Sequence, residues 1–429
     1  MKTFLCALFV WMFILSAIEY IVAINYKTNE SDYELFDTSN NKFSFRLNMF
    51  KYIVSPLSNR IFSTLPRNPE LLRKMNKMQP IFPKEMKFPC DTNNTRSIER
   101  PNSVHQLRPG DIDVIGAIGD SLAVGMGTFT NRLLEIFIPE EGVSWIGGGH
   151  ESWRQYLTIP NIIKEFNPNL FGYAFGTSMS KSIQKQFNVA QGASEIDDLL
   201  PMTENLINRM KMSNKVNFNQ DWKLIIIHIG SNTICRGVCI SSNISTFIRN
   251  FRNQYMKSLQ FIKNNLPRTM VHLLSTINLD TIFHNMKRPQ ECHFFNNILE
   301  CPCYLNKFYK SKQTLYSQVI EKIKEVEKEI AENPEFKRDD NFTVILQPMS
   351  GNFSIPLNKM KTKDTTYLAS DCFHLSQKGY ALAATSLWNN MMEPIGKKTK
   401  TNDNIKIGQL ICPTNELPFI ATWKNRLRN

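Results

Sequence analysis

The sequence predicts an α/β fold in which helices cover both faces of a mostly parallel sheet. From about residue 108 onward, short apolar runs alternate with stretches of helical periodicity, which is the pattern of parallel strands joined by helices. Several of the apolar runs show no alternation with polar residues, as expected for strands that are buried on both faces. With 429 residues, one large domain with insertions fits the length as well as three small ones.

The expected strands and helices follow from these patterns. Strands are predicted at 113–118, 170–175, 223–229, 270–277 and 343–347. Helices are predicted from 3.6-residue apolar spacing at 130–137, 195–212, 244–264, 314–331 and 377–392. Pro201 is expected to interrupt the second helix, because proline lacks the backbone N–H that a helix interior uses. The cysteine-rich stretch 292–303 is expected to be an insertion after the fourth strand.

The N-terminal region has a different composition. Lys2 is followed by an apolar run of 15 residues, 4–18, which is short of the roughly 20 residues that cross a bilayer. We therefore expect residues 1–23 to be a signal peptide of a secreted protein, with an uncleaved anchor as the alternative. Residues 24–85 are expected to form an arm or pro-segment, and 86–425 the folded domain. The terminal TWKNRLRN contains no apolar tail, so no C-terminal anchor is expected.

Cysteine usage agrees with an oxidising compartment. Without Cys6, eight cysteines remain, an even number that suits four disulfides, although eight cysteines allow 105 pairings. They are Cys90, Cys235, Cys239, Cys292, Cys301, Cys303, Cys372 and Cys412. A zinc site made of Cys292, His293, Cys301 and Cys303 is the alternative. Sequons at Asn29, Asn93, Asn243, Asn341 and Asn352 are consistent with the same compartment.

Composition and charge narrow the classes of partner. The chain is 42% hydrophobic and 21% charged, which excludes a collagen-like or mainly disordered protein. A net charge of +13 favours anionic partners such as phospholipid surfaces, nucleic acid or glycosaminoglycans, and charge alone does not choose among them.

A serine stands where the first strand ends. The segment GAIGDSLAVGMG places Ser121 directly after this strand and at the start of a helix. Ligands of open parallel sheets bind at the carboxyl ends of strands, so Ser121 is a candidate nucleophile. The alternative is an ordinary helix-capping serine. Asp120 is interpreted either as a brace of this turn or as a direct aid to the geometry of the site.

Two further strand ends carry candidate oxyanion donors. FNVAQGA places Gly192 in a turn, where its backbone N–H can point into a cleft without a side chain in the way. HIGSNT places Asn232, with its side-chain amide, at the end of the third strand. Each residue alone is as easily a turn residue, and the placement at successive strand ends is the informative fact.

The segment SDCFHLSQKGY supplies a possible acid and base. Asp371 and His374 stand three residues apart just before a predicted helix, and a serine nucleophile needs such an orienting carboxylate and imidazole. A surface loop with a capping aspartate is the alternative. His228 lies inside an apolar strand and is expected to be a packed core residue.

These four segments, in this order, resemble the SGNH (GDSL) hydrolase family, whose Ser, Gly, Asn and His match Ser121, Gly192, Asn232 and His374. The flanking segments DWKLIIIHIGSN and ICPTNELPFIATWKN are similar to the membrane-associated phospholipase B subfamily over about residues 85–425. The resemblance implies a flavodoxin-like three-layer α/β/α fold. It also implies a serine lipid esterase that hydrolyses acyl esters of phospholipids and lysophospholipids.

The implied mechanism has Ser121, Asp371 and His374 as catalytic residues and Ser121, Gly192 and Asn232 as the oxyanion hole. We expect no metal, no cofactor and no nucleic-acid partner, and a monomer that acts on lipid at a membrane or micelle surface. The alternatives are an SGNH esterase acting on carbohydrate acetyl or other short-chain esters, and an inactive lipid-binding relative.

Two features complicate the resemblance. The family's third block usually reads Gly-x-Asn-Asp, whereas here Thr233 follows Asn232, so a supporting carboxylate is missing. The loop SWIGGGHESW, with Trp145 and Trp153, is interpreted either as a flexible apolar rim for acyl chains or as a packed loop at the sheet edge.

Overall fold

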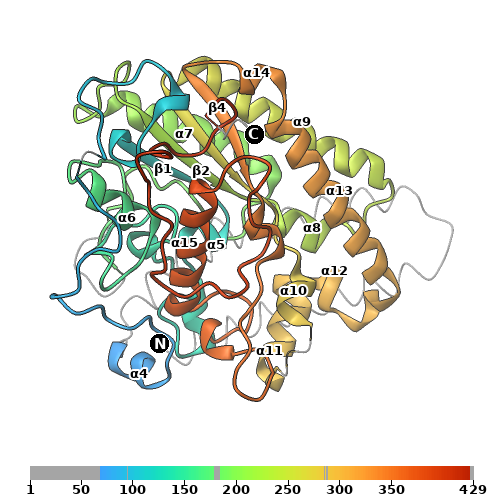
Figure 1. Cartoon of the computed structure of the whole chain (residues 1–429). Helices are drawn as coiled ribbons and strands as arrows, with labels where there is room; N and C mark the ends of the chain where they lie inside the picture. Colours follow the sequence, from blue (N-terminus) through green and yellow to red (C-terminus); the bar gives the residue numbers. More distant parts are fainter. Residues whose placement is uncertain (1–67, 94, 178–183, 285, 287, 426–429) are drawn as a thin grey trace. The chain divides into compact units, whose positions relative to one another are not determined.

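The computed structural model describes residues 68–93, 95–177, 184–284, 286 and 288–425 (Figure 1). Its centre is a four-stranded sheet of β1 (Val114–Gly119), β2 (Lys223–His228), β3 (Thr269–Leu274) and β4 (Phe342–Gln347). All neighbouring strands are parallel, and their order in the sheet follows the chain, β1-β2-β3-β4. All four carboxyl ends therefore meet at one edge of the sheet.

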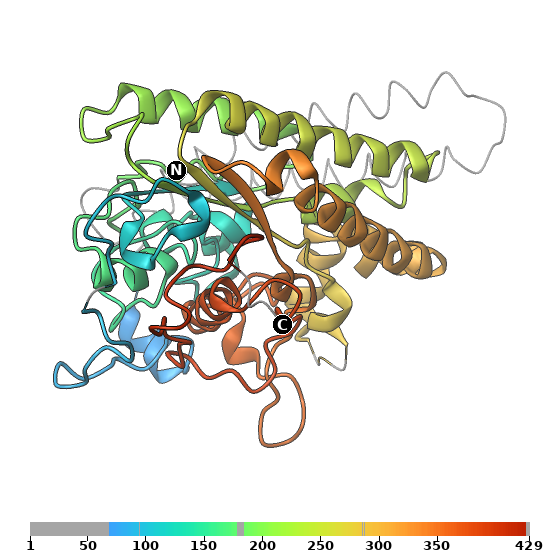
Figure 2. The ribbon, with the colours of Figure 1, turned by 45° about the horizontal axis from the view of Figure 1, so that its top comes forward.

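Helices cover both faces of the sheet, which confirms the predicted three-layer α/β/α architecture. One layer contains α7 (Leu199–Met212), α9 (Ile244–Asn265) and α13 (Gln313–Ala331), which pack side by side. The other contains α5 (Ser121–Val124), α6 (Ile159–Phe166) and α15 (Gln377–Met392). Figure 2 shows α7 and α9 on the face of the sheet opposite α15.

Shorter helices connect these layers. The α-helices are α4 (Pro69–Lys74), α8 (Ser231–Gly237), α10 (Leu279–Phe283), α11 (Gln290–Phe295), α12 (Pro302–Leu305) and α14 (Pro334–Lys337). One turn of π-helix spans Asn296–Glu300, and 3₁₀-helical turns include Leu133–Phe137, Ile196–Asp198 and Thr365–Tyr367. Between β3 and α13 lie α10, α11 and α12, so the cysteine-rich stretch is an insertion after this strand, as predicted.

The predicted strand at 170–175 is wrong in form, although the segment does lie along the free edge of β1. Phe171 makes one isolated parallel bridge to β1. Gly172 then has φ +101, a left-handed conformation that ends the extended run. Residues 187–189 complete this edge through hydrogen bonds with Ala117. Two short pieces thus take the place of one strand, and the second leads directly toward Gly192.

Two helix predictions also need correction. The predicted helix at 130–137 is a 3₁₀ turn, and the Glu135 carboxylate accepts the backbone N–H groups of Asn131 and Arg132 at its start. Pro201 does not interrupt α7. It is the third residue of that helix, where a backbone N–H would have no acceptor within the helix, so proline costs nothing there.

All eight cysteines outside the N-terminal run are paired, which overturns the zinc alternative. The disulfides are Cys90–Cys412, Cys235–Cys301, Cys239–Cys303 and Cys292–Cys372. His293 therefore has no thiolates with which to share a metal ion. Of the sequon asparagines, Asn93, Asn243 and Asn341 are exposed and Asn352 is partly exposed, while Asn29 lies outside the described residues.

The described part of the predicted N-terminal arm, 68–85, packs against the domain. Gln79 is buried and exchanges hydrogen bonds with Gln377, at the first turn of α15, over 2.6 and 2.9 Å. Its side-chain amide also donates to the carbonyl oxygen of Trp153. The predicted signal peptide, 1–23, lies outside the described residues. Among the helices that the structure describes, none is long and apolar enough to cross a membrane.

The end of β1 is packed so closely against β2 that Gly119 has no room for a side chain. A Cβ atom at this position would overlap the carbonyl oxygen of His228 on β2. We expect Gly119→Ala to lower the free energy of unfolding by about 3 kcal/mol or more, because backbone cannot move aside. Gly396→Ala is the control, since Gly396 also has positive φ but no atom within 4 Å of the added carbon. It should cost only about 1 kcal/mol. Equal losses in urea unfolding would contradict this account.

Candidate active site

Ser121 is held at the carboxyl end of β1 by a short, capped helix. Asp120 is the N-cap of α5, and its Oδ1 accepts the backbone N–H of Leu122 over 3.0 Å. Gly125 ends the helix in a left-handed conformation after only four residues. Ser121 is therefore the first residue of a short turn at the carboxyl edge of the sheet, and it is 7% exposed.

The structure brings Ser121, His374 and Asp371 into one line of hydrogen bonds. Nε2 of His374 lies 2.7 Å from Oγ of Ser121, and Nδ1 lies 2.6 Å from Oδ2 of Asp371. All three side chains are buried. In this arrangement an imidazole can take the serine proton while the carboxylate fixes its orientation, so the geometry suits nucleophilic attack by Ser121.

The Asp371 carboxylate is fixed from several directions. Its Oδ1 accepts the backbone N–H groups of Phe373 and His374, each over 3.1 Å. Asn296, in the cysteine-rich insertion, donates its side-chain amide to the backbone carbonyl of Asp371 over 2.9 Å. Cys372, the next residue, has φ +57 and forms a disulfide with Cys292 of the same insertion. The insertion thus holds the turn that carries the acid and the base through a hydrogen bond and a disulfide.

The insertion also contributes Glu300, which the sequence analysis missed. A carboxylate oxygen of Glu300 lies within 4.8 Å of both a carboxylate oxygen of Asp371 and a ring nitrogen of His374. Its neighbour Cys301 is bonded to Cys235 of α8. Nothing in the local sequence distinguishes Glu300, because its contact with the site depends on how the disulfides fold the insertion back.

Negative charge around His374 raises its pKa. Burial alone lowers the pKa of His374, but the Asp371 carboxylate, Glu300 and the hydrogen bond to Asp371 outweigh burial and raise the pKa to about 9. Asp120 adds to the same effect. Burial raises the pKa of Asp120 to about 6 and that of Glu300 to about 7.

The predicted oxyanion residues lie beside the nucleophile turn. Gln191 donates its backbone N–H to Gly119, which places Gly192 next to the end of β1. A Cβ atom on Gly192 would come within 2.8 Å of the Met126 sulfur, so glycine leaves this approach open. Asn232, buried at the start of α8, uses one amide N–H for the carbonyl oxygen of Ser194 over 3.0 Å. Its second N–H is left for another acceptor.

Three side chains of α8 hold the segment that follows Gly192. Besides Asn232, Thr233 accepts the backbone N–H of Ile196 over 2.8 Å, and Arg236 donates to the carbonyl oxygen of Ala193. Arg236 also lies 3.6 Å from Glu195. Thr233, where the family usually has aspartate, therefore acts as an acceptor that ties this segment to α8.

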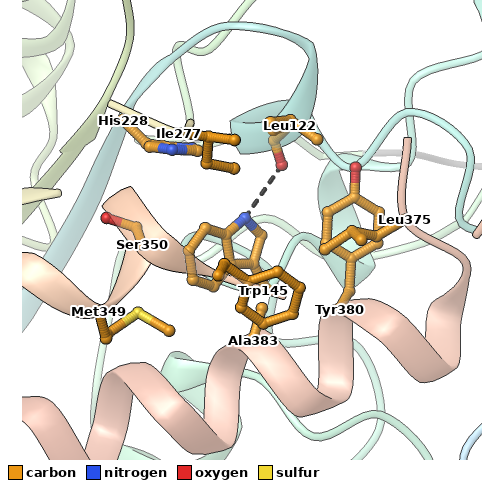
Figure 3. A pocket seen from close by; sticks show the side chains of 10 residues that line it. Leu122, Trp145, His228, Ile277, Met349, Ser350, Leu375, Tyr380 and Ala383 are labelled. Carbon is orange, nitrogen blue, oxygen red and sulfur yellow. Dashed lines mark hydrogen bonds between the residues drawn. The ribbon is translucent and has the colours of Figure 1, made fainter. Parts of the chain in front are cut away.

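The tryptophan loop is packed, not an open rim. Trp145 and Trp153 are 3% and 1% exposed. Trp145 donates its indole N–H to the carbonyl oxygen of Leu122, next to the nucleophile (Figure 3). It lines a small apolar cavity with His228, whose ring it meets edge-on at 5.6 Å. His228 is buried, as predicted, and burial lowers its pKa to about 4.

A metal ion does not fit this site without breaking it. Histidine, cysteine, aspartate and glutamate side chains can bind metal ions. Among the described residues, one group of three such side chains lies close enough to share an ion: Glu300, Asp371 and His374. Both ring nitrogens of His374 and both carboxylate oxygens of Asp371 already have hydrogen-bond partners. An ion would have to replace those bonds.

A parallel α/β/α sandwich with a Ser–His–Asp line at its carboxyl edge defines a class of protein, the serine hydrolases of this fold. The model of the GDSL-like lipase/acylhydrolase family matches residues 115–387, which include Ser121, Asp371 and His374. The chain belongs to this family.

Curated relatives extend the match beyond the family model. The chain is 34% identical to the mouse protein "Phospholipase B1, membrane-associated" over 333 residues, which cover 77% of the chain and 22% of the relative. It is 33% identical to the human protein of the same name over 336 residues, 76% of the chain and 23% of the relative. The chain thus spans about a quarter of the length of these relatives.

The basic pKa of His374 predicts the pH dependence of ester hydrolysis. His374 must be neutral to accept the Ser121 proton, so kcat/KM for a soluble short-chain ester should rise with pH, with its midpoint near pH 9. The measurement is a pH–rate profile. A midpoint at the ordinary histidine pKa of 6.5 would contradict the assigned electrostatics.

Glu300→Gln should move the same profile. Removing this negative charge lowers the pKa of His374, so the rising limb should shift to lower pH by about one unit. The shift should be partial, because the negative charges of Asp371 and Asp120 still raise the pKa of His374. The positive charges of Arg236 and Lys77 also interact with these acids and remain in the variant. Glu325→Gln, on an exposed glutamate of α13, is the control and should leave the profile unchanged. No shift in the Glu300 variant would exclude this role.

Thr233→Val should lower kcat about tenfold, because the buried Ile196 N–H loses its acceptor and the segment after Gly192 loosens. Thr385→Val is the matched control. Thr385 lies on α15, and its hydroxyl likewise accepts the backbone N–H of a loop residue, Gly408. It should cost similar stability and leave kcat unchanged. Equal effects on kcat would show that Thr233 has no special link to the site.

Proposed function

We propose that the chain is a secreted serine lipid esterase that hydrolyses acyl esters of glycerophospholipids and lysophospholipids, in the manner of a phospholipase B. The observation that carries the proposal is the Ser121–His374–Asp371 line at the sheet edge of a GDSL-family chain. The similarity to phospholipase B1 supports the choice of lipid substrates.

In the proposed reaction, Oγ of Ser121 attacks the ester carbonyl carbon while Nε2 of His374 accepts the hydroxyl proton. Asp371 holds the imidazole in the required orientation and stabilises its protonated form. His374 then gives the proton to the leaving alcohol, and an acyl-enzyme remains on Ser121. Water, deprotonated by His374, attacks the acyl-enzyme and releases the fatty acid.

The oxyanion would be bound by the backbone N–H groups of Ser121 and Gly192 and by the second amide N–H of Asn232. Each such donor typically contributes about 3 kcal/mol to the transition state. Thr233 and Arg236, the other two α8 residues that hold the segment 193–196, are positioning residues in this scheme, because they fix Gly192 without touching substrate.

Secretion and domain limits belong to the same proposal. Four disulfides suit an oxidising compartment, and the apolar run after Lys2 suits a signal peptide over 1–23. We place the hydrolase domain at 86–425 and treat 24–85 as an N-terminal arm, whose described end supports the domain through Gln79. The enzyme would act as a monomer, without a cofactor.

Ser121→Ala should reduce hydrolysis of both a soluble ester and a phospholipid by at least about 10⁴-fold with little loss of stability. The matched control is Ser231→Ala, because Ser231 is equally buried, lies beside Asn232 and has no hydrogen-bond partner among the described residues. It should keep most of the activity. A fluorophosphonate probe should label the wild type at Ser121. Near-wild-type turnover by Ser121→Ala would refute the proposed nucleophile.

Products of a mixed-chain phosphatidylcholine distinguish the proposed substrate class from its alternatives. In the presence of EDTA, mass spectrometry should find both fatty acids and glycerophosphocholine, because the site holds an ester and an acyl chain without a metal. Build-up of one lysophospholipid, or loss of activity on chelation, would contradict a phospholipase B. Turnover of short acyl esters alone would favour the short-chain esterase.

A further inference from the structure

Exposed apolar side chains gather on two segments of the described chain. Six of its ten exposed large hydrophobic residues lie either in 68–88, the arm segment, or in 355–364, the hairpin segment. They are Leu71, Met75, Ile81, Met86, Leu357 and Met360. Met360 is 80% exposed and Ile81 51%. Exposing such side chains to water is unfavourable, so this grouping needs an explanation beyond packing.

The same two segments are strongly basic. Together they contain eight lysine and arginine residues against three acidic ones. The exposed cations alternate with the apolar side chains: Arg73, Lys74, Lys84 and Lys87 in the arm segment, Lys359 and Lys361 in the hairpin segment. An interface that is both apolar and cationic matches the boundary between the headgroups and acyl chains of an anionic lipid layer.

Both segments are hydrogen-bonded to the start of α15, just after the turn that carries the candidate acid and base. In the arm segment, Lys77 accepts the backbone N–H of Lys378, four residues after His374. Burial lowers the pKa of Lys77, and the Asp371 carboxylate opposes that effect. The hairpin segment runs into the 3₁₀ turn Thr365–Tyr367, whose Thr366 carbonyl accepts the Ser376 hydroxyl.

The two segments also project in the same direction. In Figures 1 and 2, α4 of the arm segment and the orange loop of the hairpin segment lie at the same lower end of the described domain. The start of α15, which follows the turn with His374, is bonded to both of them. A flat surface that touches α4 and the hairpin segment would therefore lie at the end of the domain to which the residues just after His374 are bonded.

We propose that the arm and hairpin segments together form a docking face for an anionic phospholipid surface, which presents the candidate active site to lipid. The inference rests on the proposed function and adds where and how the enzyme meets its substrate. Apolar side chains would enter the upper acyl region while the lysines contact headgroup phosphates. A nucleic acid would use the lysines alone and leave Met360 and Ile81 in water, so it fits this face less well.

Binding is tested in the Ser121→Ala background, so that lipid is not consumed. Sedimentation would compare vesicles of phosphatidylcholine with vesicles of equimolar phosphatidylcholine and phosphatidylglycerol. The apolar variant carries Met75→Ser, Ile81→Ser and Met360→Ser, and the charge variant carries Lys74→Glu, Lys84→Glu and Lys359→Glu. The control carries Met212→Ser and Phe308→Ser, which are exposed residues outside both segments.

We expect the unmodified face to prefer the anionic vesicles, and both face variants to bind them at least tenfold more weakly than the control does. With Ser121 restored, the face variants should keep their kcat/KM on a soluble short-chain ester and lose hydrolysis of vesicles. Unchanged vesicle binding by both variants would overturn the proposal, as would equal losses in the soluble and vesicle assays.

Two further outcomes separate this proposal from others. Binding that falls only in the charge variant would indicate a polyanion without an apolar phase and would overturn the lipid assignment. A wild type that hydrolyses neither ester would refute the proposed function, and the binding assay in the Ser121→Ala background would still decide whether the docking face exists.

Discussion

The hydrogen bond between Asp371 and His374 is the contact on which the arrangement of the site depends. A buried carboxylate is costly unless its oxygens are satisfied, and here the imidazole and two backbone N–H groups satisfy them. These partners require a tight turn with Cys372 in a left-handed conformation. The disulfide to Cys292 and the Asn296 amide then hold that turn from outside, so the insertion supports this carboxylate.

The sheet supplies the other half of the geometry. Ser121 and His374 are 253 residues apart in the chain, and they meet because parallel strands end at one edge. The same edge receives α8, whose side chains hold the segment after Gly192. Nucleophile, base and oxyanion candidates thus come from separate connections of one sheet.

Much of this organisation could be predicted from the sequence. Unbroken apolar runs predicted all four strands, and the segments around Ser121, Gly192, Asn232 and His374 predicted where they lie. The strand at 170–175 failed because Gly172 changes the backbone direction, which apolar periodicity does not record. The disulfide pairing, the approach of Glu300 and the burial of Gln79 were beyond reach, since each depends on contacts between distant parts of the chain.

The arrangement of the site depends on the redox state of the cysteines. Cys235–Cys301 and Cys239–Cys303 join the insertion to α8, and Cys292–Cys372 joins it to the turn with Asp371. A chain whose thiols are still reduced lacks all three links, so the helix with Asn232 and the turn with His374 are no longer held to a common support. Full assembly of the site therefore depends on an oxidising environment, in which these three bonds can form and persist.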